Sequence, residues 1–174
     1  MEAHGIIPEI IDTKPSALAK VVYPGGVTVE LGKELTPTQV KDQPEVSFAG
    51  EDGSFYTLFM IDPDVPAEYR DICHWLVINI PGSNVAQGQT VIEYVGSGPS
   101  KESGVHRYVF LVFKQTDKIT TDLFVNKTSQ EKRGKVKTRD YIAKFKLGAP
   151  VAGNLFKAQY DDYVPTVRKQ VGLE

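Results

Sequence analysis

The segment Gly104–Lys114, with the sequence GVHRYVFLVFK, constrains the fold more than any other part of the chain. It is dense in β-branched and aromatic residues and has no proline or internal glycine, a pattern typical of a β-strand. Successive side chains of a strand point to opposite faces, so a strand that is apolar throughout is covered on both sides. We therefore expect this segment to be a central strand of a layered β-structure.

Further short apolar runs, separated by turn residues, predict more strands. Phe55–Ile61 is apolar on both faces and is expected to be central, in a hairpin with Glu45–Ala49. The other expected strands are Lys20–Tyr23, Val27–Glu30, a strand opened by His74, Thr90–Val95, Ile119–Phe124 and Asn154–Tyr160.

The last forty residues change to a helical period. Thr138 is placed to cap a helix that Gly148 ends, and Asp161-Asp162 precede a final helix that reaches Val171. Many strands followed by two short C-terminal helices predict a mainly β fold, an antiparallel β-sandwich.

Composition limits the classes of protein to consider. The chain has 174 residues, 41% of them hydrophobic, which suits one domain over residues 1–174 with residues 1–19 as an N-terminal arm. Lys and Arg total 20 against 22 Asp and Glu, which gives no argument for a nucleic-acid partner. A membrane span or signal peptide is not expected, and the lone Cys73 agrees with a reducing compartment, so we predict a cytoplasmic protein.

The stretch Asp62–Gly82 points to a small-molecule site. Its Asp62-Pro63-Asp64 turn closes one apolar strand and His74 opens another, so polar groups gather where two buried strands end. Taken singly, these residues also have structural readings: aspartates beside proline commonly cap turns, and a histidine on an apolar strand is commonly a core residue.

Several motifs occur together in one order. They are Leu35-Thr36-Pro37, Asp62-Pro63-Asp64-Val65-Pro66, His74, Gly96-Ser97-Gly98-Pro99, Gly104-Val105-His106-Arg107-Tyr108, Arg133-Gly134-Lys135, Ala149-Pro150-Val151 and Asp161-Asp162-Tyr163. In this set the chain resembles the phosphatidylethanolamine-binding proteins, also called the Raf kinase inhibitor family, from about residue 20 to the C-terminus.

The resemblance implies a β-sandwich with Greek-key-like connections and an anion-binding pocket at one end. It implies a non-enzymatic binding protein without a cofactor, which takes a phospholipid headgroup or another small phosphorylated ligand and has a protein kinase as a further partner. By position, the implied ligand-binding residues are Asp62, Pro66, His74, Gly96, Gly98, Pro99, His106, Tyr108 and Tyr163. Val65-Pro66 matches a dipeptide that is cis in the family, and Tyr163 matches an aromatic lid.

The chemistry of these residues suits a phosphate ester, because histidines, a tyrosine hydroxyl and glycine-rich backbone all offer donors. A carboxylate at Asp62 would repel phosphate unless it charges a histidine or accepts from an ammonium group, so a zwitterionic headgroup is the favoured ligand. We expect His74 and Asp62 to form the ligand-facing pair.

Two departures from the family pattern lie near His74. Only seven residues separate it from Pro66, and Ile72-Cys73 stand where an aromatic residue is expected. The pocket wall is therefore predicted to be shorter and less aromatic there.

Other functions remain as alternatives. A serine-protease inhibitor or protein-interaction module would make the pocket secondary, and a phosphoester hydrolase would use His74 and Asp62. A metal site is not expected, and no G-x-S-x-G motif or P-loop occurs. A basic run predicts contact with an anionic membrane through Lys127, Lys132, Arg133, Lys135, Lys137 and Arg139.

Overall fold

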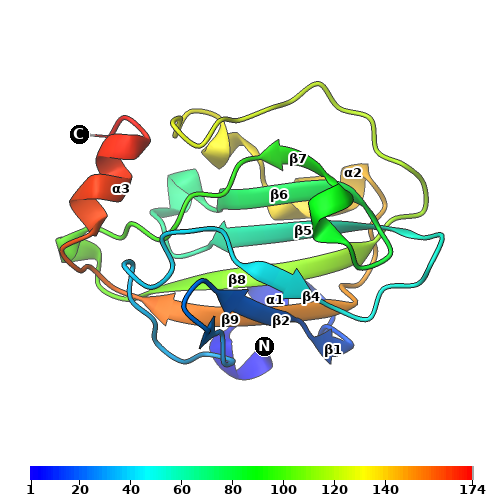
Figure 1. Ribbon diagram of the computed structural model, residues 1–174, viewed down its shortest axis with the longest axis horizontal. Helices are drawn as coiled ribbons and strands as arrows, with labels where there is room; N and C mark the ends of the chain where they lie inside the picture. Colours follow the sequence, from blue (N-terminus) through cyan, green and yellow to red (C-terminus); the bar gives the residue numbers. More distant parts are fainter. Residues whose placement is uncertain (174) are drawn as a thin grey trace.

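Two β-sheets form the body of the protein in a computed structural model that describes residues 1–173 (Figure 1). The larger sheet has the order β1-β9-β8-β5-β6-β7 and the smaller sheet has the order β3-β2-β4. The strands are β1 (Ala17–Leu18), β2 (Lys20–Tyr23), β3 (Val27–Thr28), β4 (Glu45–Ser47), β5 (Phe55–Asp62), β6 (Ile72–Pro81), β7 (Gln89–Ile92), β8 (His106–Lys114) and β9 (Ala152–Ala158). All paired neighbours among these strands are antiparallel except β1 and β9. The predicted mainly β fold is confirmed, with this parallel pair as an exception.

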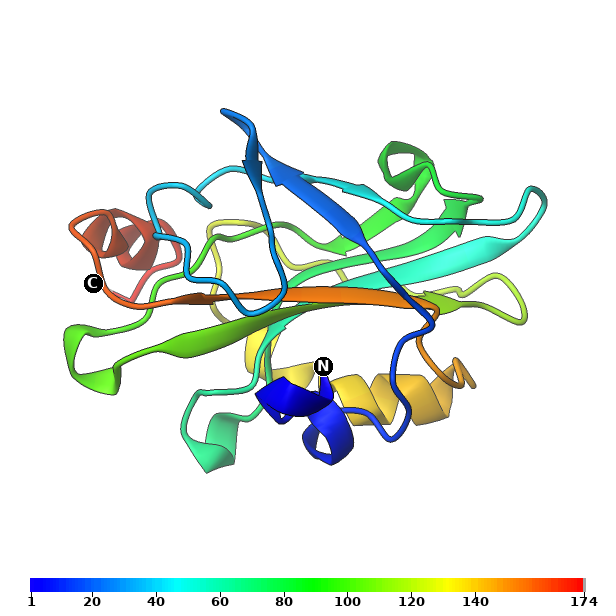
Figure 2. The same cartoon turned by 90° about the horizontal axis from the view of Figure 1, so that it is seen from below.

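The larger sheet is covered on both faces, by different kinds of structure (Figure 2). The smaller sheet lies over one face, and α1 (Ile6–Glu9) and α2 (Thr138–Lys144) lie against the other. The helix α3 (Val164–Gln170) lies at one end of the sheet. The described part of the chain also has five short 3-10 turns: η1 (Glu2–His4), η2 (Ala67–Tyr69), η3 (Val85–Gln87), η4 (Lys101–Ser103) and η5 (Arg133–Lys135).

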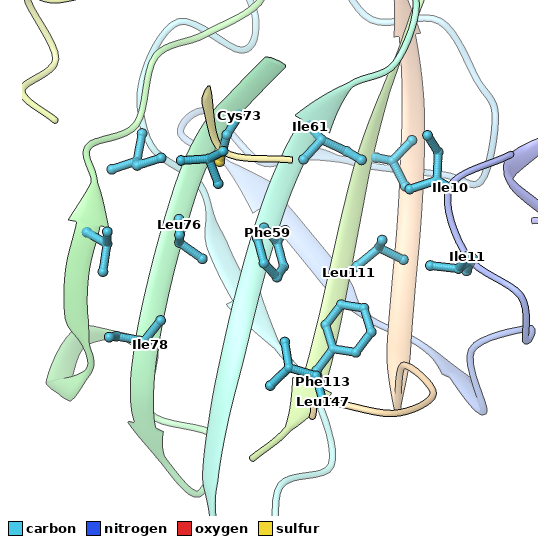
Figure 3. Packing of buried hydrophobic residues seen from close by; sticks show 14 of the residues in the cluster. Ile10, Ile11, Phe59, Ile61, Cys73, Leu76, Ile78, Leu111, Phe113 and Leu147 are labelled. Carbon is cyan, nitrogen blue, oxygen red and sulfur yellow. The ribbon is translucent and has the colours of Figure 1, made fainter. Parts of the chain in front are cut away.

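Alternating side chains of the central strands fill two separate cores. On β5, Phe59 and Ile61 face the helical layer, while Leu58 and Met60 face the smaller sheet, and all four are fully buried. Figure 3 shows the helical side, where Phe59 and Ile61 lie among apolar side chains of the neighbouring strands. Burial on both faces explains why β5 and β8 are apolar throughout, and it confirms their predicted central position.

Two strand predictions are wrong. The β4 strand pairs with β2 in the smaller sheet, so it does not form a hairpin with β5. The segment 119–124 forms no strand. At its first residue the backbone bonds to a side chain instead of to a strand: Asn79 Nδ2 donates to Ile119 O at 2.8 Å and Oδ1 accepts from Ile119 N at 2.8 Å.

The N-terminal arm belongs to the core of the helical side. Met1, Ile6, Ile10 and Ile11 are buried against the larger sheet, and Figure 3 shows Ile10 and Ile11 beside it. Within residues 1–173, none of the helices has the length and apolar character needed to cross a membrane.

Candidate functional site

A cavity of about 250 Å³ opens where three strands of the larger sheet have their ends. Asp62 closes β5 and is paired with Ile72 at the start of β6, while β8 begins at His106 on the other side of β5. Antiparallel pairing brings the end of one strand beside the start of the next, so residues far apart in sequence meet at this edge. The loop after β7 and the helix α3 complete the walls.

The cavity brings together eight of the nine residues predicted from the sequence. They are Asp62, Pro66, His74, Gly96, Gly98, Pro99, His106 and Tyr108. Tyr163 does not line it: its ring packs against the small apolar cluster of Val95, Val167 and Val171, with Lys41 Nζ 5.6 Å from the ring centroid. The expected aromatic lid does not line the cavity; the side chains that reach it from α3 and its C-cap are Val167, Arg168 and Val171.

Asp62 is paired with His106. His106 Nδ1 donates to Asp62 Oδ2 at 2.7 Å, and both side chains are about 95% buried. Burial lowers the pKa of His106, but the hydrogen bond and charge of Asp62, with Asp64 nearby, outweigh burial and raise that pKa above its usual value. Asp62 and His74 both line the cavity, and the carboxylate of Asp62 charges His106, the histidine on β8.

His74 has the opposite character. Its Nδ1 lies 2.8 Å from Val95 O, and a carbonyl can only accept, so Nδ1 carries the proton. Burial is the main cause that lowers the pKa of His74, so the ring is neutral at pH 7. In this tautomer the remaining nitrogen, Nε2, is an acceptor, and the two pocket histidines present opposite hydrogen-bonding character.

Tyr108 holds the two imidazoles in place. Its ring stacks on His106 at a centroid distance of 6.3 Å and on Phe156 at 5.2 Å, and it meets the His74 ring edge-on at 5.3 Å. Burial, together with the nearby Asp62 carboxylate, raises the pKa of Tyr108 well above its usual value, so its hydroxyl stays neutral. The floor of the cavity is thus made of packed rings and carries a neutral hydroxyl.

Asp64 braces the turn from outside the cavity. It accepts from Arg107 N at 2.7 Å, from Arg107 Nε at 2.9 Å and, through its other oxygen, from a terminal Arg107 nitrogen at 2.7 Å. Arg107 also bonds to Glu9 at 3.0 Å and to His4 O at 2.7 Å. Burial raises the pKa of Asp64, but these Arg107 bonds outweigh it and lower that pKa. The network ties the Asp-Pro-Asp turn to β8 and to the N-terminal arm.

Two glycines form the wall after β7 for different reasons. A Cβ on Gly96 would lie 2.8 Å from Val40 O, so the close approach of two backbone segments requires glycine there. A Cβ on Gly98 would lie 3.3 Å from Val167 Cγ1, a side chain of α3. Glycine at position 98 therefore lets α3 close over the pocket.

Arg133 was predicted to contact a membrane, and the structure contradicts this because its side chain is buried. It donates to four backbone carbonyls: Nε to Ser129 O at 2.6 Å, one terminal nitrogen to His74 O at 3.2 Å and Glu93 O at 2.9 Å, and the other to Asn126 O at 3.0 Å. Burial lowers the pKa of Arg133 to about 10. The residue is a structural clamp behind the pocket.

Other members of the basic run are also engaged. Lys137 Nζ donates to Tyr69 O at 2.9 Å, and Arg139 bonds to Pro8 O and to Asp12 in the N-terminal arm. Lys127, Lys132, Lys135 and Arg139 are exposed, and Arg139 is paired with Asp12 at 3.0 Å. Of the six residues predicted to contact a membrane, four are therefore exposed.

The turn before His74 lacks the cis peptide bond that the family resemblance implied. Val65–Pro66 is not cis; the cis bonds within residues 1–173 are Ile7–Pro8 and Arg70–Asp71. Ile72, which stands where the family pattern has an aromatic residue, lines the cavity. Cys73 is buried in the core on the helical side of the larger sheet. Burial raises the pKa of the Cys73 thiol to about 12.

Sequence reasoning missed several residues of the cavity. They are Val65, Val95, Ser100, Ser103, Gln130, Val167, Arg168, Val171 and Leu173. The spacing of Val167 and Val171 marks an apolar helix face and is a signal that could have found them. Ser103 carried no such signal, because its role depends on a contact with His106 that only the folded chain forms.

Comparisons with known proteins agree with this geometry. Residues 25–158 match the model of a family described as phosphatidylethanolamine-binding protein. The chain is 38% identical over 174 residues to "Putative odorant-binding protein A5" of Drosophila melanogaster, covering 97% of this chain and 83% of that protein. It is 39% identical over 162 residues to a 26 kDa secreted antigen of Toxocara canis, covering 90% of this chain and 62% of the antigen.

A solved structure of carboxypeptidase Y inhibitor in complex with its cognate proteinase has the same fold. The TM-score is 0.75 at 25% sequence identity, and the match covers 92% of this chain and 93% of the inhibitor.

Proposed function

The chain belongs to the phosphatidylethanolamine-binding protein family, and from that premise we propose that its pocket binds a small phosphorylated group that also carries an ammonium group. A phosphorylethanolamine headgroup has this chemistry. The observation that carries the proposal is the opposite character of the two histidines: His106 is poised as a cationic donor and His74 as a neutral acceptor.

Each half of such a ligand has a partner of suitable chemistry. Phosphoryl oxygens accept from Nε2 of protonated His106, in place of the Ser103 hydroxyl that lies 2.9 Å from it, and from the Tyr108 hydroxyl. The ammonium group donates to His74 Nε2. The Asp62 carboxylate, which by itself would repel phosphate, is bonded to His106 and strengthens the charge on that ring. The donor lies on β8 and the acceptor on β6, so the two contacts together fix the orientation of the ligand in the cavity.

Isothermal titration with phosphorylethanolamine at pH values from 5 to 8 tests this proposal. Affinity should fall as pH rises through the raised pKa of His106, because the neutral ring gives up its charge-assisted bond. His106→Gln should weaken binding by about tenfold to a hundredfold, the range of one lost hydrogen bond to a charged group. His4→Gln is the matched control, since His4 is the remaining histidine of the chain and lies outside the cavity. Equal affinity at all pH values and in all variants would reject the proposal.

We further propose that the pocket binds phosphoesters without cleaving them. The hydrolase alternative needed Asp62 to act with His74, whereas Asp62 is bonded to His106 and His74 to a backbone carbonyl. Incubation with a panel of phosphate monoesters and diesters should give saturable binding and no product. Product formation that is lost in His74→Ala would favour the hydrolase.

Inhibition of a serine protease is the second candidate function, and the similarity to carboxypeptidase Y inhibitor supports it. A titration of carboxypeptidase Y activity with this protein tests it directly. If the double variant His74→Ala/His106→Ala still inhibits while phosphorylethanolamine binding is lost, inhibition uses a surface other than the pocket.

A kinase partner, an anionic membrane partner and a cytoplasmic location stay predictions. Liposome sedimentation at low and high salt tests the membrane, with Lys127, Lys132, Lys135 and Arg139 as the exposed basic groups. Co-precipitation with a purified Raf-type kinase tests the second partner, and cell fractionation tests the location.

A further inference from the structure

Ser103 forms a contact that phosphoryl binding does not explain. It ends the η4 turn at the rim of the cavity, with its side chain exposed. Its Oγ lies 2.9 Å from His106 Nε2, while His106 Nδ1 lies 2.7 Å from Asp62 Oδ2. A hydroxyl, an imidazole and a carboxylate thus stand in one hydrogen-bonded row, each contributed by a different element: η4, β8 and β5.

We propose that Ser103 is a nucleophile that takes an acyl group from activated carboxylic esters, with His106 as its general base and Asp62 as the group that orients the imidazole. Such a row of three side chains is recognised by geometry and roles and occurs on unrelated folds, so the lack of a G-x-S-x-G sequence does not exclude it. The activity is additional to phosphoryl binding. It needs the same histidine in its neutral form.

The proton positions follow from what each atom can accept. Asp62 accepts from His106 Nδ1, which leaves Nε2 as the basic nitrogen when the ring is neutral. The Ser103 hydroxyl has one hydrogen and two acceptors, Nε2 of His106 and Ser100 O, the latter also at 2.9 Å. With His106 protonated, Nε2 donates to Oγ and the hydroxyl turns to Ser100 O. With His106 neutral, the hydroxyl donates to Nε2 and is activated.

The reaction balances without a cofactor. Ser103 Oγ forms a bond to the ester carbonyl carbon, its proton passes to His106 Nε2, and the bond from that carbon to the leaving oxygen breaks. The leaving alcohol receives the proton from Nε2, which gives an acyl-serine and a free alcohol. Water then attacks the acyl-serine, with Nε2 again accepting and returning the proton, and releases the carboxylic acid.

The groups around His106 set the pH range of the reaction. Those facing it or lining the same cavity are Asp62 on β5, Asp64 in the following turn, Tyr108 on β8, His74 on β6 and Arg168 on α3. The carboxylates prevail and raise the pKa of His106. Acylation should therefore increase as pH rises through that pKa, over the range in which phosphorylethanolamine binding decreases. A phosphoryl group bonded to Nε2 would occupy the base, so phosphorylethanolamine should inhibit acylation.

The test is acylation of the full chain by p-nitrophenyl acetate at pH 8, followed by nitrophenolate release and by peptide mass spectrometry. We expect one acetyl group on Ser103 and a burst of one nitrophenolate per chain. Ser103→Ala should abolish this burst, and His106→Gln should slow it about a hundredfold, the usual contribution of a general base. Ser83→Ala is the matched control, because Ser83 is an exposed serine just beyond the far end of β6 and should react like the wild type.

An unacetylated Ser103 in the wild type, or an undiminished burst in Ser103→Ala, would overturn the proposal. Because Ser103 is exposed, Ser103→Ala should keep the stability of the wild type within about 0.5 kcal/mol, and thermal unfolding checks this. Phosphorylethanolamine binding by Ser103→Ala separates the two proposals: retained binding with no acylation in any variant would reject the nucleophile alone.

Discussion

Replacement of Arg133 by alanine should destabilise the protein severely, although the residue lies in a polar, basic segment. Its guanidinium is buried and donates to four carbonyl oxygens, of Ser129, His74, Glu93 and Asn126. Hydrogen bonds from a charged donor contribute about 1.5–3 kcal/mol each, and the burial of the charge offsets much of that sum. Loss of the side chain leaves the four carbonyls without this donor, for which about 4 kcal/mol is expected.

Thermal unfolding followed by circular dichroism measures this loss. For a chain of this length, 4 kcal/mol corresponds to a fall of about 12 °C in Tm, at roughly 3 °C for each kcal/mol. Lys135→Ala is the matched control, since Lys135 is an exposed cation two residues away and should change stability by less than about 0.5 kcal/mol. Arg133→Lys should recover only part of the loss, because an ammonium has three donors and no planar fork.

A Tm of Arg133→Ala within about 2 °C of the Lys135→Ala value would refute the reasoning. That result would mean that water or a rearranged loop satisfies the carbonyls at little cost. The clamp would then have no part in holding His74 and the loop after β7 at the pocket.

Three further predictions concern the pocket and its surroundings. The stability advantage of the wild type over His106→Gln should be complete below about pH 6.5 and lost as pH rises through the raised folded pKa, as urea unfolding at several pH values would show. Gly96→Ala should lower stability by about 1–3 kcal/mol because its Cβ meets backbone, and Gly98→Ala should cost less because its Cβ meets a Val167 side chain; equal Tm values would contradict this. Cys73 should react with a thiol reagent at pH 8 only upon unfolding, since its pKa is about 12 and it is buried, so rapid labelling of the native protein would be evidence against this packing.

The sequence predicted the central strands well because strands that are buried on both faces have an apolar amino-acid composition. The middle positions of β5 and β8 are almost all apolar and rich in β-branched and aromatic residues, which favours strands buried on both faces. Which strands pair with each other cannot be read from composition in this way. The β4 strand is polar at alternate positions, which fits either sheet, and its partner β2 was not identifiable from the pattern.

The sequence predicted which residues line the candidate site, but it did not predict which of them bond to each other. Eight predicted residues line the cavity, since motifs in the order of a known family place them there. Which carboxylate meets which histidine depends on the register of β5 with β8 and β6, and a difference of one residue changes the answer. The sequence therefore did not show which histidine Asp62 would charge, and Arg133 was misjudged because a buried arginine and a surface arginine look alike in sequence.

Arg133 also bears on how a pocket that contains a carboxylate attracts a phosphate. Protonated His106 and Asp62 cancel each other in charge, so this pair orients a ligand and adds no net positive potential. Arg133 is the buried cation behind the same wall, and its hydrogen bonds go to carbonyl oxygens, with Glu93 as the nearby charge that partly balances it. Its field reaches the cavity, because Arg133 contributes to the lowered pKa of His74 whereas Asp62 opposes it. Burial is the main cause of the lowered pKa of His74, and the charge of Arg133 adds to it, so the clamp helps to keep that ring an acceptor for an ammonium group while its charge favours the phosphoryl group of the same ligand.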